Sequence, residues 1–232
     1  MTRALPALLV ASLTAPALTS PAFAARAATS PKAQQAAGQH EMHQRHNDPK
    51  AYAASLDDPK RDEYQKPDAV IAALQVTPGQ VVADIGAGTG YFSVRLARAV
   101  GDAGRVYAVD VNADMAQHLN RRVRDANIAN IVGVLAPPDD PLLREQSVDL
   151  VFICDVWHHI EQQEAYLAHL RRALKPGGRL VMIDFQKREL PVGPPVDMKI
   201  AKEDLIAQMQ RAGWTVAREH DILPYQYFIE FR

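Results

Sequence analysis

The chain has 232 residues, of which 47% are hydrophobic, and its 26 Lys and Arg residues are balanced by 27 Asp and Glu residues. These values are ordinary for a globular protein with one sizeable core. The net charge of −1 gives no global basic field of the kind that nucleic-acid-binding proteins use, so we expect no nucleic-acid partner. With a single cysteine, Cys154, an intramolecular disulfide is excluded.

The first 24 residues have the three-part pattern of a secretory signal peptide. Arg3 gives a basic start, residues 4–18 are apolar and uncharged, and Ala22 and Ala24 are the small residues that a cut after Ala24 requires. The apolar stretch contains two prolines and is a poor transmembrane helix. We therefore expect export, to a bacterial periplasm, without stable membrane insertion after processing. The alternative is an Ala/Pro-rich extension on a cytoplasmic enzyme.

Residues 25–47 are rich in Ala and Gln, which predicts a flexible linker. His40, His43 and His46 follow one another at a spacing of three, and three histidines on one helical turn could hold a metal ion. Because this segment precedes the fold, we interpret it as a polar linker and expect no metal site.

Residues 48–232 are predicted to form the folded domain, beginning with short helices. Asp58-Pro59 and Lys66-Pro67-Asp68 each place proline where a first helical position is expected. Within this lead-in, Arg61 and Tyr64 are three residues apart and could face a site together.

The most informative segment is residues 81–92, where a β-rich apolar run enters Gly86, Gly88 and Gly90 before a helical pattern. A glycine turn between strand and helix allows close backbone approach to a ligand, with free N–H groups at the start of the helix. A second strand, residues 105–109, ends at Asp110, where a carboxylate can accept hydrogen bonds from both ribose hydroxyls. The chain is therefore predicted to bind an adenosine-type cofactor.

The identity of that cofactor depends on the charge beside the turn. The glycine spacing differs from the dinucleotide fingerprint, and Asp84 lies two residues before the first glycine. A carboxylate there would repel a pyrophosphate and attract an ammonium group. These features favour S-adenosylmethionine, which carries an amino group and no phosphate, over a nicotinamide cofactor.

The rest of the chain alternates between strand and helix patterns, which predicts an α/β fold with a Rossmann-like doubly wound sheet, mostly parallel, and an antiparallel C-terminal edge strand. Helices are expected at residues 115–126, 161–174 and 199–212, and strands at residues 130–135, 149–154, 179–185, 215–219 and 225–231. Ligands of such sheets bind at the carboxyl ends of the strands.

Four segments in order, residues 81–92, 106–110, 147–152 and 174–180, resemble the motifs of class I S-adenosylmethionine-dependent methyltransferases. The resemblance covers residues 67–232, implies S-adenosylmethionine as the cofactor, and suggests that the lead-in helices form a partial lid. The residues that it implies for cofactor binding are Asp84, Gly86, Ala87, Gly88, Gly90, Asp110, Val111, Asp139 and Asp155.

The end of the fourth strand, residues 154–160, is the second candidate site, because in many small-molecule methyltransferases the matching stretch faces the methyl group. Asp155 or its carbonyl could hold the methionine ammonium. His158 or His159 could act as a general base, or each could be a structural histidine. Methyl transfer can also proceed without a base, because the sulfonium is already activated. We expect aromatic walls from Trp157 and nearby tyrosines, Tyr64 and Tyr91.

The predicted function is methyl transfer to a small, partly apolar acceptor, similar to the quinone and lipid-precursor enzymes. The Asp155-Val156-Trp157 run lacks the proline pair of DNA amino-methyltransferases, and one cysteine is too few for arsenite methylation. An isoaspartyl-type protein methyltransferase, a non-catalytic protein that binds the cofactor or its product, and a nicotinamide oxidoreductase remain as alternatives. Neither the acceptor nor the oligomeric state follows from the residues.

Overall fold

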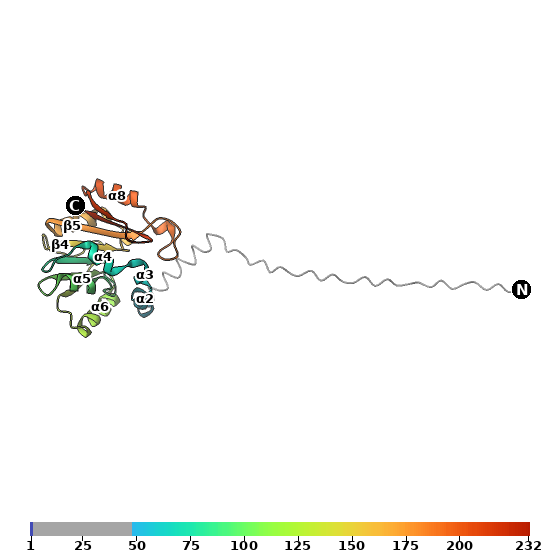
Figure 1. Cartoon of the computed structure of the whole chain (residues 1–232), viewed down its shortest axis with the longest axis horizontal. Coiled ribbons are helices and arrows are strands. Elements are labelled where there is room, and N and C mark those ends of the chain that lie inside the picture. The colour runs from blue at the N-terminus through green and yellow to red at the C-terminus, as the bar shows by residue number, and fades with distance from the viewer. Residues whose placement is uncertain (2–47) are drawn as a thin grey trace.

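The computed structural model describes Met1 and residues 48–232 (Figure 1). The predicted signal peptide, the linker and its three histidines lie outside the described residues, apart from Met1. None of the helices in the described part of the chain is long and apolar enough to cross a membrane.

Seven strands form one sheet in the order β3-β2-β1-β4-β5-β7-β6. The strands are β1 (Val81–Ile85), β2 (Arg105–Asp110), β3 (Ile131–Leu135), β4 (Val148–Cys154), β5 (Leu174–Phe185), β6 (Val216–His220) and β7 (Gln226–Phe231). The first five pair in parallel, and β7 pairs antiparallel with both β5 and β6. The predicted α/β class and mostly parallel sheet are confirmed. The last strand of the chain lies inside the sheet, so β6 forms the edge.

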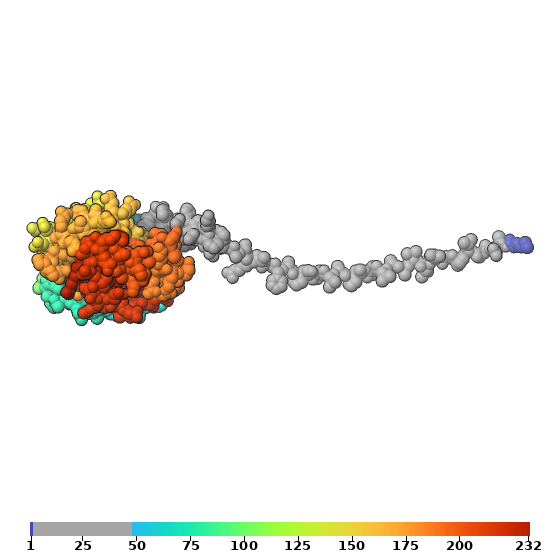
Figure 2. All heavy atoms as spheres, turned by 90° about the horizontal axis from the view of Figure 1, so that it is seen from above, coloured from blue at the N-terminus to red at the C-terminus, as the bar shows by residue number. Residues whose placement is uncertain are grey.

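Helices cover both faces of the sheet. They are α2 (Pro49–Leu56), α3 (Arg61–Gln65), α4 (Pro67–Leu74), α5 (Ser93–Val100), α6 (Ala113–Asp125), α7 (Gln163–Ala173) and α8 (Lys202–Arg211), with 3-10 turns η1 (Trp157–His159) and η2 (Val196–Met198). Residues of α4, α5 and α6 belong to one buried cluster and residues of α7 and α8 to the other. Figure 1 shows α8 at the top of the domain and α6 at the bottom. In Figure 2 the C-terminal part of the chain, coloured red, covers the face toward the viewer.

Two cores result from the alternation of side chains along the strands. In β4, Leu150 and Phe152 pack with residues of α4 and α5, whereas Val151 and Ile153 pack with residues of α7 and α8. All four side chains are buried. This burial on both faces explains the nearly pure apolar sequence of β4, as in other central parallel strands.

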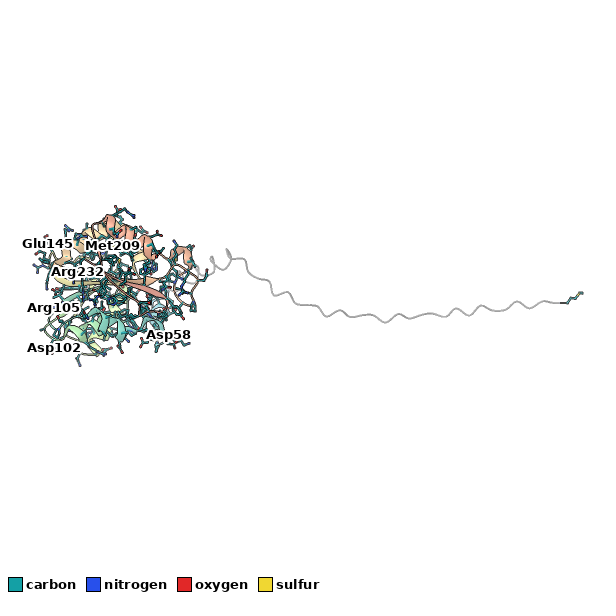
Figure 3. All side chains as sticks on the ribbon, turned by 45° about the horizontal axis from the view of Figure 1, so that its top comes forward. Asp58, Asp102, Arg105, Glu145, Met209 and Arg232 are labelled. Atoms are coloured by element: carbon teal, nitrogen blue, oxygen red, sulfur yellow. The ribbon has the colours of Figure 1, made fainter. Side chains whose placement is uncertain are left out.

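The two ends of the sheet differ in what surrounds them. Figure 3 places Asp102 and Arg105, the first residue of β2, at the end of the domain opposite Asp58. Asp58 lies between α2 and α3. The short N-terminal helices therefore lie at the end of the domain where the parallel strands have their carboxyl ends, which is where ligands of such sheets bind.

Candidate cofactor site

A cavity of about 310 Å³ lies at the carboxyl ends of β1, β2 and β4. The glycine turn forms one wall, and α2 and α3 supply Tyr52, Leu56 and Arg61 to another. The lead-in segment, predicted from the resemblance to be a partial lid, therefore contributes directly to this cavity. Of the residues implied for cofactor binding, Asp84, Gly86, Ala87, Gly88, Asp110, Val111 and Asp155 line it.

The N–H groups of the glycine turn are largely used within the protein. Those of Gly86 and Ala87 donate to the carbonyl of Val109, at 2.8 and 3.0 Å, and that of Gly90 donates to Ala87 at 2.9 Å. The N–H of Gly88 donates to the Asp110 carboxylate at 2.7 Å. These four N–H groups therefore have partners within the protein, whereas the free N–H groups predicted from the sequence are those at the start of α5. A turn with its donors already bonded suits a ligand without phosphates.

The three glycines have different roles. A Cβ on Gly88, whose φ is +55°, would lie 2.9 Å from Leu56 Cδ1, and both residues line the cavity. A Cβ on Gly90 would instead lie 2.4 Å from Leu119 Cδ1, and Gly90 is absent from the cavity wall. The expected contact of Gly90 with the cofactor is therefore not what the structure indicates. Its missing side chain allows α6 to pack against the turn.

Asp110 both shapes the turn and faces the cavity. Its second carboxylate oxygen accepts from the N–H of Asn112 at 2.8 Å. Burial raises the pKa of Asp110, while hydrogen bonds from the backbone of Asn112, Gly88 and Val111 oppose that rise. A carboxylate can accept about four hydrogen bonds, so acceptor positions are left for the hydroxyls of a ribose.

Asp84 is a buried carboxylate at the base of the cavity, with 4% of its surface exposed. The hydroxyl of Ser93 donates to it at 2.6 Å. Burial raises the pKa of Asp84 to about 7, against the opposing effect of the Ser93 hydrogen bond. A buried carboxylate beside a cavity is stabilised by a positively charged ligand, as expected for the ammonium group of a methionine moiety.

Asp155 follows β4 in the left-handed conformation, with φ at +58°. Two glutamine amides hold its carboxylate: Gln65 of α3 donates at 2.9 Å, and Gln226 of β7 donates at 2.7 and 2.9 Å. Burial and the nearby charge of Asp184 raise the pKa of Asp155 to about 6. Sequence reasoning missed both glutamines, because they lie 90 and 71 residues away from Asp155 in the chain.

The two histidines after β4 have different environments. His158 has only 3% of its side chain exposed, and its Nδ1 lies 2.9 Å from Asp184. Burial lowers the pKa of His158, but the hydrogen bond to Asp184 and the charges of Asp184 and Asp155 raise it by more, so the net shift is upward. The cavity wall does not include His158. Its expected place in the acceptor site is therefore not supported, and the structural alternative describes it better.

His159 is exposed and lines the main cavity. It also lines an adjoining cavity of about 100 Å³ with Val111, Pro137, Pro138 and Tyr166. This apolar recess beside Asp110 is suited to the adenine ring. Asp139, expected to contact the adenine amino group, is exposed and lines neither cavity. Pro137 and Pro138, which follow β3 after Ala136, line the recess in its place.

The aromatic residues that line the cavity are only partly those predicted from the sequence. Tyr91 lines the cavity as expected, and Tyr52 does so without having been predicted. Trp157 has 1% of its surface exposed and lies in the core, where its indole N–H donates to Gln208 at 3.2 Å. Tyr64 is absent from the cavity wall and packs near Phe185 and Tyr225, at ring-centroid distances of 6.1 and 6.3 Å.

Asp57, at the end of α2, fastens the lead-in segment to the glycine turn. It accepts hydrogen bonds from the Thr89 hydroxyl at 2.7 Å and from Arg122 at 2.9 Å, and His118 lies 3.3 Å away. Thr89 stands between Gly88 and Gly90. The position of the lead-in segment is therefore tied to the conformation of the turn.

A larger cavity of about 590 Å³ opens beside α8 and the start of β7. Its wall is strongly polar and includes an ion pair between Lys202 and Glu219 at 2.9 Å. Gln226 also lines it and donates to Asp155, which lines the cofactor cavity. The two cavities are thus separated by this hydrogen-bonded pair. Within residues 48–232, no group of three or more His, Cys, Asp or Glu side chains is placed to hold a metal ion.

Comparison with known proteins agrees with this geometry. Residues 82–178 match the family model described as "Methyltransferase domain". A ubiquinone/menaquinone biosynthesis C-methyltransferase of Vibrio vulnificus is 30% identical over 154 residues, which cover 66% of this chain and 57% of that protein. The chain thus spans little more than half the length of this curated relative.

Solved structures agree as well. A SAM-dependent methyltransferase from Aquifex aeolicus has a TM-score of 0.75 and 28% identity, covering 79% of this chain and 97% of its own. Magnesium protoporphyrin IX methyltransferase from Synechocystis, crystallised with bound SAM, shares the fold with a TM-score of 0.55 and 22% identity, covering 72% of this chain and 77% of its own. Residues 82–178 therefore form a methyltransferase domain, in a fold that this chain shares with a SAM-dependent methyltransferase.

Proposed function

We propose that this protein transfers a methyl group from S-adenosylmethionine to a small, partly apolar acceptor. The observation that carries the proposal is the single cavity in which Asp110, the glycine turn and Asp84 lie together with His159 and the aromatic Tyr52 and Tyr91. The part of the cavity formed by Asp110, the glycine turn and Asp84 suits an adenosine and an amino acid. The part formed by Tyr52 and Tyr91 offers aromatic surface to a substrate.

The residues of this chain would hold both reactants in line. When bound, S-adenosylmethionine supplies a methyl group on an activated sulfonium. Asp110 would accept from the ribose hydroxyls, Asp84 and Asp155 would balance the ammonium charge, and the recess at Pro137 and Pro138 would take the adenine. Much of the rate of such a transfer can come from positioning alone, because a fixed geometry replaces an encounter between two molecules.

The relative from Vibrio vulnificus is a C-methyltransferase by name, which supports an acceptor whose nucleophilic atom is an activated carbon. On such an acceptor a carbon–methyl bond forms as the methyl–sulfur bond breaks, and the acceptor carbon then loses a proton. His159, at the cavity wall, would take that proton. His158 is buried against Asp184 and is assigned no contact with the acceptor.

The test has two stages. Titration calorimetry with S-adenosylhomocysteine measures cofactor-site binding, and NADH serves as the competing ligand for an oxidoreductase. Protein incubated with methyl-labelled S-adenosylmethionine and an extract of small molecules from the native host is then examined for labelled products by mass spectrometry. Binding of S-adenosylhomocysteine together with a labelled small product supports the proposal. Binding without any labelled product supports the non-catalytic alternative, and label on protein supports a protein methyltransferase.

We also propose that the protein is exported to the periplasm after cleavage behind Ala24. The proposal rests on the charged start, the apolar stretch and the small residues before the cut. N-terminal sequencing of the protein from its native host tests it. A mature start at Ala25 in a periplasmic fraction supports export, whereas an intact start in the cytoplasmic fraction supports the cytoplasmic alternative.

A further inference from the structure

The charges around the cofactor cavity are unequal. Three carboxylates line it, those of Asp84, Asp110 and Asp155, whereas Arg61 is the sole Lys or Arg in its wall among the residues that the structure describes. S-adenosylmethionine carries an ammonium, a sulfonium and one carboxylate. The carboxylates of the protein therefore have cationic or hydroxyl partners on this ligand, and the ligand's own carboxylate requires a positive partner.

Arg61 has the position and the free donors for this role. It opens α3, and its guanidinium carbon lies 4.3 Å from the ring centroid of Tyr91, another residue of the cavity wall. One of its N–H groups donates to the carbonyl of Leu56, and its side chain also bonds to Tyr64. Within the described part of the chain it forms no ion pair with a carboxylate.

A guanidinium has five N–H donors in a planar fork, which matches the two oxygens of a carboxylate. The stacked Tyr91 ring and the Leu56 carbonyl fix the plane of the Arg61 group, so that little side-chain freedom is left to lose on binding. Tyr91 in turn donates to Asp62, and Arg95 donates to the Tyr91 carbonyl at 2.8 Å. Arg61 is thus held in place by other residues while donors remain available to the cavity.

We propose that Arg61 binds the carboxylate of the methionine moiety, and so joins α3 to the bound cofactor. This inference rests on the proposed function and extends it, because it assigns the recognition of the amino-acid end to the lead-in segment. A ligand with adenosine alone would leave Arg61 without its partner. The site therefore distinguishes the complete cofactor from adenosine thioethers that lack the amino acid.

The test compares ligands that differ only at that end, in titration calorimetry on the whole protein. S-adenosylhomocysteine carries the carboxylate and the ammonium, decarboxylated S-adenosylhomocysteine carries the ammonium alone, and 5′-methylthioadenosine carries neither. Arg61→Met should weaken binding of S-adenosylhomocysteine by about tenfold or more, the effect of losing a charge-assisted contact. It should leave the affinities of the two ligands without a carboxylate nearly unchanged. Arg61→Lys, which keeps the charge but loses the fork, should recover part of the affinity.

Arg95→Met is the matched control. The guanidinium of Arg95 lies 4.4 Å from the same Tyr91 ring, but Arg95 does not line the cavity. If Arg61 acts only by stabilising Tyr91 and α3, the two methionine variants will weaken all three ligands alike, and the proposal is overturned. Unchanged binding of S-adenosylhomocysteine by Arg61→Met overturns it too. Failure of the unmodified protein to bind S-adenosylhomocysteine would instead contradict the proposed function.

Discussion

Replacing Asp84 with asparagine should make the protein more stable and less able to bind its cofactor. The asparagine would keep the shape of the side chain and an oxygen for the Ser93 hydroxyl, which now lies 2.6 Å from the carboxylate. It would remove a negative charge from a residue that has only 4% of its surface exposed and no cationic partner within the described residues. The substitution therefore separates the demands of folding from those of ligand binding.

The magnitude follows from the pKa of Asp84. Burial raises that pKa from 3.8 to about 7, which at about 1.36 kcal/mol per pKa unit corresponds to roughly 4 kcal/mol of stability lost when the group ionises. Because the folded pKa lies above the unfolded one, the wild-type protein is most stable, relative to the variant, at low pH. Its relative stability falls as the pH rises from about 4 to 7, and stays low above 7.

Urea unfolding of both proteins between pH 5 and 8.5 measures this difference. The free energy of unfolding of Asp84→Asn minus that of the wild type should increase with pH and level off near pH 7. Contributions from other groups, such as Asp155, cancel in the difference. Ser93→Ala is a matched control, because loss of its hydrogen bond should move the levelling-off to higher pH. Calorimetry at pH 8 should show S-adenosylhomocysteine bound about tenfold or more weakly by Asp84→Asn.

A stability difference that does not change with pH would refute the reasoning, since it would mean that Asp84 is ionised throughout the range. Unchanged affinity for S-adenosylhomocysteine would refute the second part, the role of Asp84 in holding the ammonium group. The wild-type affinity should also decline as the pH falls below 7, because the protonated carboxyl no longer attracts a cation.

Three further variants test other parts of the site. Asp110→Ala should weaken S-adenosylhomocysteine binding about tenfold or more, since it loses hydrogen bonds to the ribose and the Gly88 N–H; calorimetry with unchanged affinity contradicts the ribose assignment. Gly88→Val should abolish S-adenosylhomocysteine binding while circular dichroism shows a folded sheet. Normal binding by this variant would mean that the turn only connects β1 to α5 and does not contact the ligand. His158→Ala should lower the free energy of unfolding by about 3–5 kcal/mol, because it leaves Asp184 buried and unpaired. That loss should be larger at pH 6 than at pH 9, because the pKa of His158 is raised in the folded protein, and the stability that protonated His158 contributes is lost as the pH rises. Equal losses at the two pH values would contradict the ion pair with Asp184.

Much of the fold could be predicted from local patterns. The periodicity of apolar residues identified the strands and helices, and their alternation identified the parallel sheet. The boundaries moved where local rules compete. β5 begins at Leu174 rather than Arg179, because Leu174 pairs with Val148 before the register shifts. The helix predicted from residue 115 begins at Ala113, where the Asn112 side chain caps it.

By itself, the sequence predicted the cofactor class and the meeting of Asp84, Gly88 and Asp110, which line one cavity in the structure. A glycine turn and an acidic strand end are separated by a short, nearly constant length of chain, so their meeting follows from one strand–helix–strand unit. Glycine spacing and the charge at Asp84 are local properties as well, and they were enough to favour an amino-acid ligand over a dinucleotide.

The tertiary structure alone decided which neighbouring residues face the cavity. His158 and His159 are adjacent in sequence, yet one is buried against Asp184 and the other lies at the cavity wall. The glutamines that hold Asp155, and Arg61 beside Tyr91, come from segments whose distance along the chain carries no pattern. Such contacts depend on how α3, β4 and β7 pack together, and packing is set by the whole core rather than by any short stretch of residues.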